Sequence, residues 1–404
     1  MEDTNMTRIV KAVLCIILVT SPTSISLQKG SSVPVIIFQA YSSLAQNSRR
    51  YLAITDSAYK TVSPFYTNAQ LDVLPVSWSP SGDMLAIVLY DEFMSHPAQI
   101  CVLTKSAQLV SCMKDEPNID AVINSGRYYY NVKWAADEKS IFFVIDTFAN
   151  YYLMQGDVST GRTIRTIYSG KNARSERSTI YSWTNSLDYF ILGAGDEARA
   201  DVAGTITLIN IPQSGSLSAL QVPKDKELVQ PAPSLKGTPL SSSSPDSTVI
   251  TQQGLWVACP FSPHDTYLPA FDQPLLDQRA EEFILFDKSA SKRLKTITYS
   301  NANDLPISCP SWNSDESLLY WESGKNKVFK YDFSSNKAHM LYQTTSLPNF
   351  ISPIVPSNLE DRLAYVSSVY PESTSIIVVD KNGLIYTLGD AQLTTDFPLW
   401  MPNK

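Results

Sequence analysis

The sequence predicts an all-β protein in which repeated four-stranded units close into a single ring. Three observations support this prediction. One phrase recurs about every 40–50 residues, further short apolar segments follow each copy, and the two ends of the chain each carry part of a unit.

The recurring phrase is an apolar run with a Trp or another bulky residue, then a polar turn, then a second apolar run. Its clearest copy extends from Val76 to Val88, with Trp78 before the turn and Gly82 within it. Because the bulky residues occupy the same place in most repeats, we expect them to pack between neighbouring units rather than to stack against a ligand. These marker residues are Trp78, Trp134, Trp183, Phe261, Trp312, Ile354 and Trp400.

Each unit continues with segments that favour a third and a fourth strand. Third strands are expected at 51–55, 151–154, 205–209, 282–286, 327–331 and 375–379. Several of them lead into turns that begin with Asp and are rich in Ser, Asn or Gly, as at Asp157, Asp287, Asp332 and Asp380. Such residues favour hairpin loops, because they mimic turns with their side chains or tolerate positive φ. Four antiparallel strands per unit, without a convincing amphipathic helix, are typical of a propeller blade.

The two termini decide the number of blades. The N-terminal unit has later strands at 34–38 and 51–55 but lacks an opening phrase, whereas Trp400 belongs to an opening phrase with no strand after it. The two halves would complete one blade and close the ring by strand exchange. We therefore expect one propeller of seven blades over residues 33–404, with six or eight as alternatives because the copy near Ile354 is weak.

The phrase from Trp78 to Asp83 resembles the Trp-Ser-Pro-Asp-Gly repeat of TolB-like, WD-type β-propeller proteins. The resemblance covers about residues 33–404, although only this copy comes near the full motif. It implies a secreted or periplasmic propeller that works as a protein-interaction scaffold. TolB itself has a further N-terminal domain for which this chain has no room, so its role in the Tol system is not carried over.

Two other segments stand out by composition. Residues 1–27 contain basic Arg8 and Lys11, an apolar run over 12–19 and a small, polar exit, which predicts a secretory signal peptide; an uncleaved anchor is the alternative. Residues 221–253 are rich in Pro and Ser, and we expect a flexible insertion between blades there. No other segment is long and apolar enough to cross a membrane.

Four cysteines would remain in an exported chain. Cys101 and Cys112 flank an expected hairpin and would face each other if its turn centres on Ser106 and Ala107. Cys259 and Cys309 occupy nearly equivalent places in successive repeats. Both pairs are disulfide candidates, with buried free thiols as the alternative.

Composition limits the partners and the chemistry. The net charge of −7 argues against nucleic acid as a partner. The three histidines, at His96, His264 and His339, form no pattern of a metal or acid–base site, and no cofactor motif is present. We expect no cofactor and a monomer.

Acidic residues recur where second strands are expected to end. They are Asp91, Glu92, Asp146, Asp196, Asp272 and Glu322. We expect these loops to share a face with the insertion and to form an acidic rim that binds a protein or a cationic ligand. The predicted function is therefore an exported binding or scaffold protein. The alternative is a hydrolase acting on glycans or peptides through carboxylates at the channel mouth, and a third reading is that these residues only cap turns.

Overall fold

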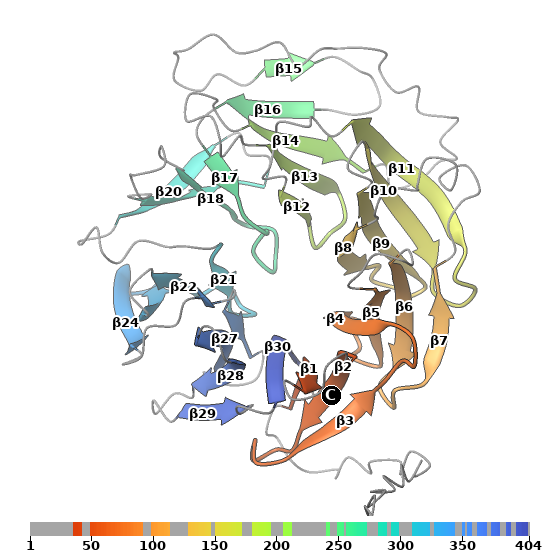
Figure 1. The fold of residues 1–404 in the computed structure, drawn as a ribbon. Helices are drawn as coiled ribbons and strands as arrows, with labels where there is room; N and C mark the ends of the chain where they lie inside the picture. The colour runs from red at the N-terminus through yellow and green to blue at the C-terminus, as the bar shows by residue number, and fades with distance from the viewer. Residues whose placement is uncertain are drawn as a thin grey trace, which may run out of the picture. The chain divides into compact units, whose positions relative to one another are not determined.

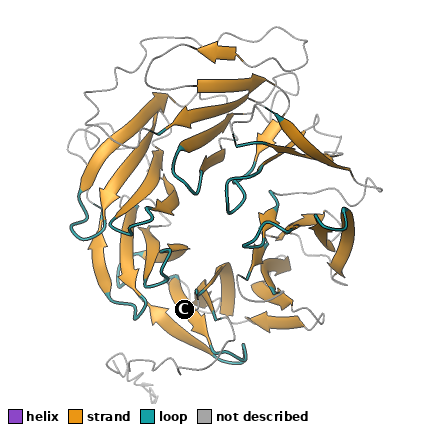
Figure 2. Cartoon of the chain, turned by 180° about the vertical axis from the view of Figure 1, so that it is seen from behind, coloured by secondary structure: helices purple, strands orange, loops and turns teal. Residues whose placement is uncertain are grey.

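The structure is a computed structural model of the 404-residue chain. It describes residues 35–42, 49–91, 98–113, 128–146, 150–171, 180–194, 205–211, 240–242, 249–253, 256–272, 282–288, 292–298, 309–323, 327–343, 350–351, 354–357, 362–369, 373–379, 385–388 and 393–402. Throughout these ranges the chain forms strands, loops and turns and no helix (Figure 2). None of these residues belongs to a helix that could cross a membrane. The predicted signal peptide, 1–27, lies outside the described residues.

The described strands form seven hydrogen-bonded sheets, numbered here from the N-terminus (Figure 1). Sheet 1 contains β30 (Leu393–Trp400), β1 (Ile36–Ser42), β2 (Tyr51–Thr55) and β3 (Val62–Tyr66). Sheet 2 contains β4 (Asp72–Trp78), β5 (Met84–Tyr90), β6 (Gln99–Thr104) and β7 (Leu109–Cys112). Sheet 3 contains β8 (Tyr128–Trp134), β9 (Ser140–Asp146), β10 (Asn150–Asp157) and β11 (Thr163–Lys171).

The other sheets repeat this order with local variations. Sheet 4 contains β12 (Ile180–Trp183), β13 (Tyr189–Ala194), β14 (Thr205–Asn210), β16 (Val249–Gln253) and β15 (Leu240–Ser242). Sheet 5 contains β17 (Trp256–Ala258), β18 (Leu268–Asp272), β19 (Glu282–Phe286) and β20 (Arg293–Thr298). Sheet 6 contains β21 (Ser311–Trp312), β22 (Leu318–Ser323), β23 (Lys327–Asp332) and β24 (Lys337–Gln343). In sheet 7, β25 (Phe350–Ile351) and β26 (Val355–Pro356) both pair with β27 (Leu363–Val369), followed by β28 (Ser373–Val379) and β29 (Ile385–Leu388).

Sheet 1 joins the two ends of the chain, as the split repeat predicted. Strand β30 pairs antiparallel with β1, and Trp400 lies opposite Ile36. The main-chain N–H of Met401 also donates to the carbonyl oxygen of Val35 at 2.8 Å. A strand from the C-terminus is therefore the first strand of the N-terminal sheet.

The marker residues pack between successive sheets, which confirms their predicted role. Trp134, Trp183, Trp312 and Trp400 are all buried. The indole Nε1–H of Trp134 in sheet 3 donates to the carbonyl oxygen of Ser77 in sheet 2 at 3.2 Å. Trp400 in sheet 1 makes the equivalent bond to Val355 in sheet 7 at 2.7 Å. Each of these indoles thus ties its own first strand to the sheet before it.

The antiparallel order divides the connections between two faces of the ring. The turns between first and second strands, and those between third and fourth strands, lie on one face, here called the turn face. The loops between second and third strands and the connections from sheet to sheet lie on the opposite face, here called the crossover face. This division decides which loops can act together.

The predicted insertion, 221–253, requires a correction. Its last residues form β16, which pairs with β14 as the fourth strand of sheet 4, and β15 pairs with β16. The chain therefore leaves sheet 4 after its third strand, at Ile211, whose N–H donates to the carbonyl oxygen of Asp188 beside the first turn. The connection from β14 to β16 therefore begins and ends on the turn face, whereas the prediction had placed the insertion in a connection between sheets, with the second-to-third loops. Residues 221–239 and 243–248 lie outside the described residues.

Both candidate disulfides are formed. Cys101 and Cys112 lie opposite each other on β6 and β7, because a bulge beside Val102 shifts the register after the turn. Cys259 of sheet 5 is bonded to Cys309, which lies just before the first strand of sheet 6. The first bond closes a hairpin, whereas the second links two neighbouring sheets.

Candidate functional sites on the two faces

The predicted acidic residues occupy the crossover face where the chain is described. Asp91 follows β5 directly, Asp146 and Asp272 end β9 and β18, and Glu322 lies one residue before the end of β22. The positions of second-strand ends are therefore as expected. The side chains of Asp146, Asp272 and Glu322 are not described, and Glu92 and Asp196 lie outside the described residues. Among the predicted rim residues, the structure describes the side chain of Asp91.

Asp91 is buried rather than solvent-exposed, which differs from the carboxylate expected on an open rim. It is 7% exposed, and its Oδ1 atom lies 3.8 Å from Nη1 of Arg49. The same Nη1 atom is 4.0 Å from Oδ2 of Asp72, the first residue of β4. The Arg49 side chain is 44% exposed, against 4% and 5% for the two aspartates. Two buried carboxylates of sheet 2 therefore lie beneath one exposed guanidinium of sheet 1.

A second arginine holds this cluster to its surroundings. The N–H of Arg50 donates to Oδ1 of Asp72 at 2.7 Å, and its Nη1 donates to the Tyr90 hydroxyl at 2.9 Å. Its guanidinium also lies 5.2 Å from the ring centre of Tyr41, a cation–π distance. Arg49, Arg50, Asp72 and Asp91 are called the arginine–aspartate cluster below. It combines two positive and two negative groups at the boundary of sheets 1 and 2.

On the turn face, one backbone feature recurs at the fourth residue after each marker. Every such residue that the structure describes has a positive φ: 73° at Gly82, 58° at Glu138, 57° at Leu187, 59° at Asp265 and 60° at Glu316. This region favours glycine, and other residues pay a conformational cost of about 1 kcal/mol or more. Only Gly82 follows that preference, so the side chains at the other positions need an explanation.

Three of these residues have a carboxylate that accepts hydrogen bonds from the turn of the preceding sheet. Glu138 of sheet 3 accepts the main-chain N–H of Ser81 in sheet 2, and it also accepts the Ser81 hydroxyl at 2.8 Å. Asp265 of sheet 5 accepts the N–H groups of Asn185 and Ser186 in sheet 4, at 2.6 and 2.8 Å. We call these contacts carboxylate clasps. Hydrogen bonds to a charged acceptor are among the stronger ones in proteins, and they offset the strained backbone.

The third clasp belongs to Glu316 of sheet 6, which accepts the N–H of His264 in sheet 5 at 2.5 Å. Burial raises the pKa of Glu316, but hydrogen bonds from Ser262, Thr266 and the His264 N–H outweigh that effect and leave the pKa below its usual value. The carboxylate is therefore held in its charged form. His264 itself is exposed in the turn.

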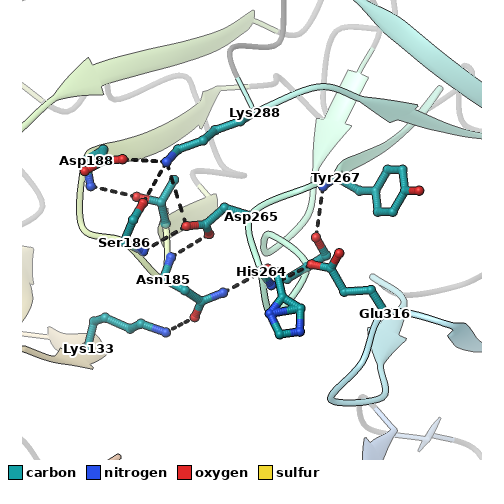
Figure 3. A network of polar contacts seen from close by, with 11 residues as sticks. Lys133, Asn185, Ser186, Asp188, His264, Asp265, Tyr267, Lys288 and Glu316 are labelled. Carbon is teal, nitrogen blue, oxygen red and sulfur yellow. Dashed lines mark hydrogen bonds and ion pairs between the residues drawn. The ribbon is translucent and has the colours of Figure 1, made fainter. Parts of the chain in front are cut away.

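Further polar side chains extend the Asp265 clasp across neighbouring sheets (Figure 3). Lys288 of sheet 5 donates to Asp188 at 2.5 Å and to the Ser186 hydroxyl at 2.8 Å, and it lies 4.0 Å from Asp265. The Asn185 side-chain amide donates to the carbonyl oxygen of Ser262 at 2.8 Å and accepts a hydrogen bond from Lys133 of sheet 3. Burial lowers the pKa of Lys133, and the nearby charge of Asp265 opposes that shift. The network joins sheets 3 to 5, and the Glu316 clasp continues it to sheet 6.

The sequence reasoning did not identify the clasps. A signal was present, because Glu138, Asp265 and Glu316 each stand at the repeat position that Gly82 occupies. An acidic residue where a turn favours glycine indicates a compensating contact, but the partner lies in another sheet. The described residues contain no group of three or more His, Cys, Asp or Glu side chains placed to hold a metal ion.

Comparison with known proteins supports the architecture. No family model and no curated protein matches the chain. TolB from Acinetobacter baumannii is 13% identical, with a TM-score of 0.46, over 92% of this chain and 83% of its own. A putative 6-phosphogluconolactonase from Bacteroides uniformis is 12% identical, with a TM-score of 0.53, over 92% of this chain and 100% of its own. An oligogalacturonate lyase in complex with manganese is also 12% identical, with a TM-score of 0.53, over 88% and 84%.

At 12% identity, the likeness to the lactonase and the lyase shows the fold alone. The radially repeated antiparallel sheets, the packing of the marker residues between them and the pairing of β30 with β1 are those of a β-propeller.

Proposed function

We propose that the protein is an exported, seven-bladed β-propeller that serves as a binding scaffold, with its interaction surface on the crossover face. In this proposal each of the seven sheets is one blade, and the blade shared by both termini closes the ring. The partner is a protein, and the second-strand ends at Asp91, Asp146, Asp272 and Glu322 surround its contact surface.

The engagement of the described turn-face and cluster carboxylates supports a scaffold over an enzyme. Glu138, Asp265 and Glu316 accept hydrogen bonds from a neighbouring sheet, while Asp72 and Asp91 lie against Arg49. A hydrolase that uses two carboxyl groups needs one of them protonated at working pH, which requires a raised pKa. The downward shift at Glu316 is opposite to that requirement. These carboxylates suit a rigid ring that presents its loops.

Export is supported by two features that point to an oxidising compartment. The basic and apolar pattern of residues 1–27 favours a signal peptide, and the pairs Cys101–Cys112 and Cys259–Cys309 are both disulfide-bonded. We propose a secreted, periplasmic or cell-surface location and a monomeric state, with no cofactor.

A hydrolase is retained as a second candidate because of one observation. Asp72 and Asp91 both lie within 4.0 Å of the same Arg49 atom, so their carboxylates are less than about 8 Å apart. This upper limit is compatible with the spacing of roughly 5–10 Å used by carboxylate pairs in glycoside hydrolases. The lactonase and lyase named above are enzymes with a similar fold, so the fold does not separate the two candidates.

Affinity capture from the native extracellular fraction tests the scaffold, with one variant for each face. The first carries Asp91→Asn, Asp146→Asn, Asp272→Asn and Glu322→Gln on the crossover face. The second replaces residues 212–239, which leave from the turn face, with a short Gly-Ser linker. We expect the first to lose a partner that the intact chain and the second retain. Equal capture by all three proteins would contradict the proposed surface, and glycan or peptide hydrolysis abolished by Asp91→Asn would favour the enzyme.

A further inference from the structure

One exposed group of the crossover face, among the residues that the structure describes, is a cation, although the face is predicted to be acidic. Arg49 is 44% exposed, and no hydrogen bond joins it to the part of the chain that the structure describes. Its two charge partners, Asp72 and Asp91, are buried and lie 4.0 and 3.8 Å from a single nitrogen, Nη1. The guanidinium thus lies against the two aspartates at one nitrogen, and none of its other donors bonds to a residue that the structure describes.

The exposed part of the arginine–aspartate cluster is its cationic part, which favours an anion at this point. Arg50 adds a second positive charge, and its guanidinium is held by the Tyr90 hydroxyl and by its position against the Tyr41 ring. Two arginines balance the two aspartates, and the aspartates are the buried members of the cluster. Charges elsewhere on the face are largely screened beyond about 8 Å at physiological ionic strength, so the nearest groups dominate.

We propose that Arg49 is a preorganised contact for a carboxylate of the partner protein. The planar guanidinium matches a carboxylate through two parallel hydrogen bonds, and a fixed arginine loses less side-chain entropy on binding than a free one. Asp91 acts here as a positioning residue for Arg49 and does not touch the partner. The partner therefore presents an acidic segment to the boundary of sheets 1 and 2. This inference rests on the proposed binding function of the crossover face.

Chemical protection of the intact protein tests the proposal without any mutation. Phenylglyoxal modifies accessible guanidinium groups, and mass spectrometry of the digest reports the rate at each arginine. The probe is a hexaglutamate peptide, with hexalysine and polygalacturonate as separate arms. Arg162, exposed in the β10–β11 turn on the other face, is the matched control. We expect hexaglutamate to slow modification of Arg49 several-fold while the rate at Arg162 stays the same.

Each other result overturns the proposal. Equal protection of both arginines would show non-specific binding, and no protection would show that Arg49 binds no acidic segment. Protection of Arg49 by polygalacturonate alone would indicate that the site binds an acidic glycan. Protection by hexalysine would indicate that this face binds a cationic ligand, as the sequence predicts.

Binding of labelled hexaglutamate to variants gives a second measurement. We expect Arg49→Gln to weaken it about tenfold, since bonds between charged groups are lost. Arg49→Lys keeps the positive charge beside Asp72 and Asp91 and removes only the planar guanidinium, so we expect a smaller loss of affinity for hexaglutamate. If Arg49→Lys and Arg49→Gln bind hexaglutamate as the native chain does, the inference is wrong. The proposed function is tested separately, because it is contradicted only by equal capture of the partner by all three proteins.

Discussion

The two faces of the propeller use carboxylates in different ways. On the turn face, Glu138 and Asp265 accept main-chain N–H groups of the neighbouring sheet. On the crossover face, Asp72 and Asp91 lie against the side chain of Arg49. A main-chain donor is held in place by the fold, while the Arg49 guanidinium is 44% exposed and can also contact a partner. The difference agrees with the proposed function, in which the turn face holds neighbouring sheets together and the crossover face binds the partner.

The largest expected effect comes from removing the strand on which both faces depend. Deleting residues 397–404 removes half of β30 together with Trp400, its bond to Val355 and its pairing with Ile36. We expect loss of the cooperative urea transition, because a ring that cannot close exposes the edge of β1 and the cores of sheets 7 and 1. Deleting 403–404 is the control. A truncated chain that still unfolds in one native-like transition would contradict closure by strand exchange.

The disulfides permit a second comparison, between a bond inside a sheet and one between sheets. Replacing Cys259 and Cys309 by Ala opens a loop with a separation of 50 residues, against 11 for Cys101 and Cys112. The chain-entropy model predicts losses in unfolding free energy of about 4 and about 3 kcal/mol, respectively. Denaturant melts of the two double variants measure the difference. A larger loss of unfolding free energy for the Cys101 and Cys112 variant would show that the Cys259–Cys309 bond adds little stability to sheets 5 and 6, which the Glu316 clasp already joins.

Matched substitutions on the two faces test the main comparison directly. Asp265→Asn removes a buried charge that accepts two main-chain N–H groups, so we expect a loss of about 2–3 kcal/mol in unfolding free energy. Asp91→Asn weakens a contact with a half-exposed arginine, for which about 1 kcal/mol or less is expected. Thermal and urea melts measure both. Equal losses would remove the distinction between a structural and a recognition face.

The smallest expected effect is a pH dependence at the Glu316 clasp. Its pKa in the folded protein is below the ordinary value of 4.5, so its charged form stabilises the fold above about that pH. This contribution is lost as the pH falls further, through the folded pKa. The unfolding free energy should decline less steeply below pH 4.5 in Glu316→Gln than in the native protein. Identical pH profiles would mean that the clasp does not contribute.

Much of the fold was predictable because its signals are local. The alternation of apolar runs and turn residues indicated the strands, and the split repeat around Trp400 predicted the pairing of β30 with β1, which is confirmed. The pairing of Cys101 with Cys112 agreed with the expected hairpin, whereas the bulge beside Val102 that sets its register was not predicted. The segment 221–253 was assigned to the wrong connection, because a Pro- and Ser-rich stretch conceals the short strand β16 within it.

The sequence by itself determined the repeat, the marker residues at the sheet boundaries and the closure of the ring, since each follows from spacing along the chain. The tertiary structure alone decided the environment of the carboxylates in the clasps and in the arginine–aspartate cluster. It buried Asp91 beneath Arg49, and it placed Glu138 and Asp265 against main-chain donors of a preceding sheet. The physical reason is that a charge is stabilised by the groups around it, and here those groups come from another sheet, tens of residues away in the chain.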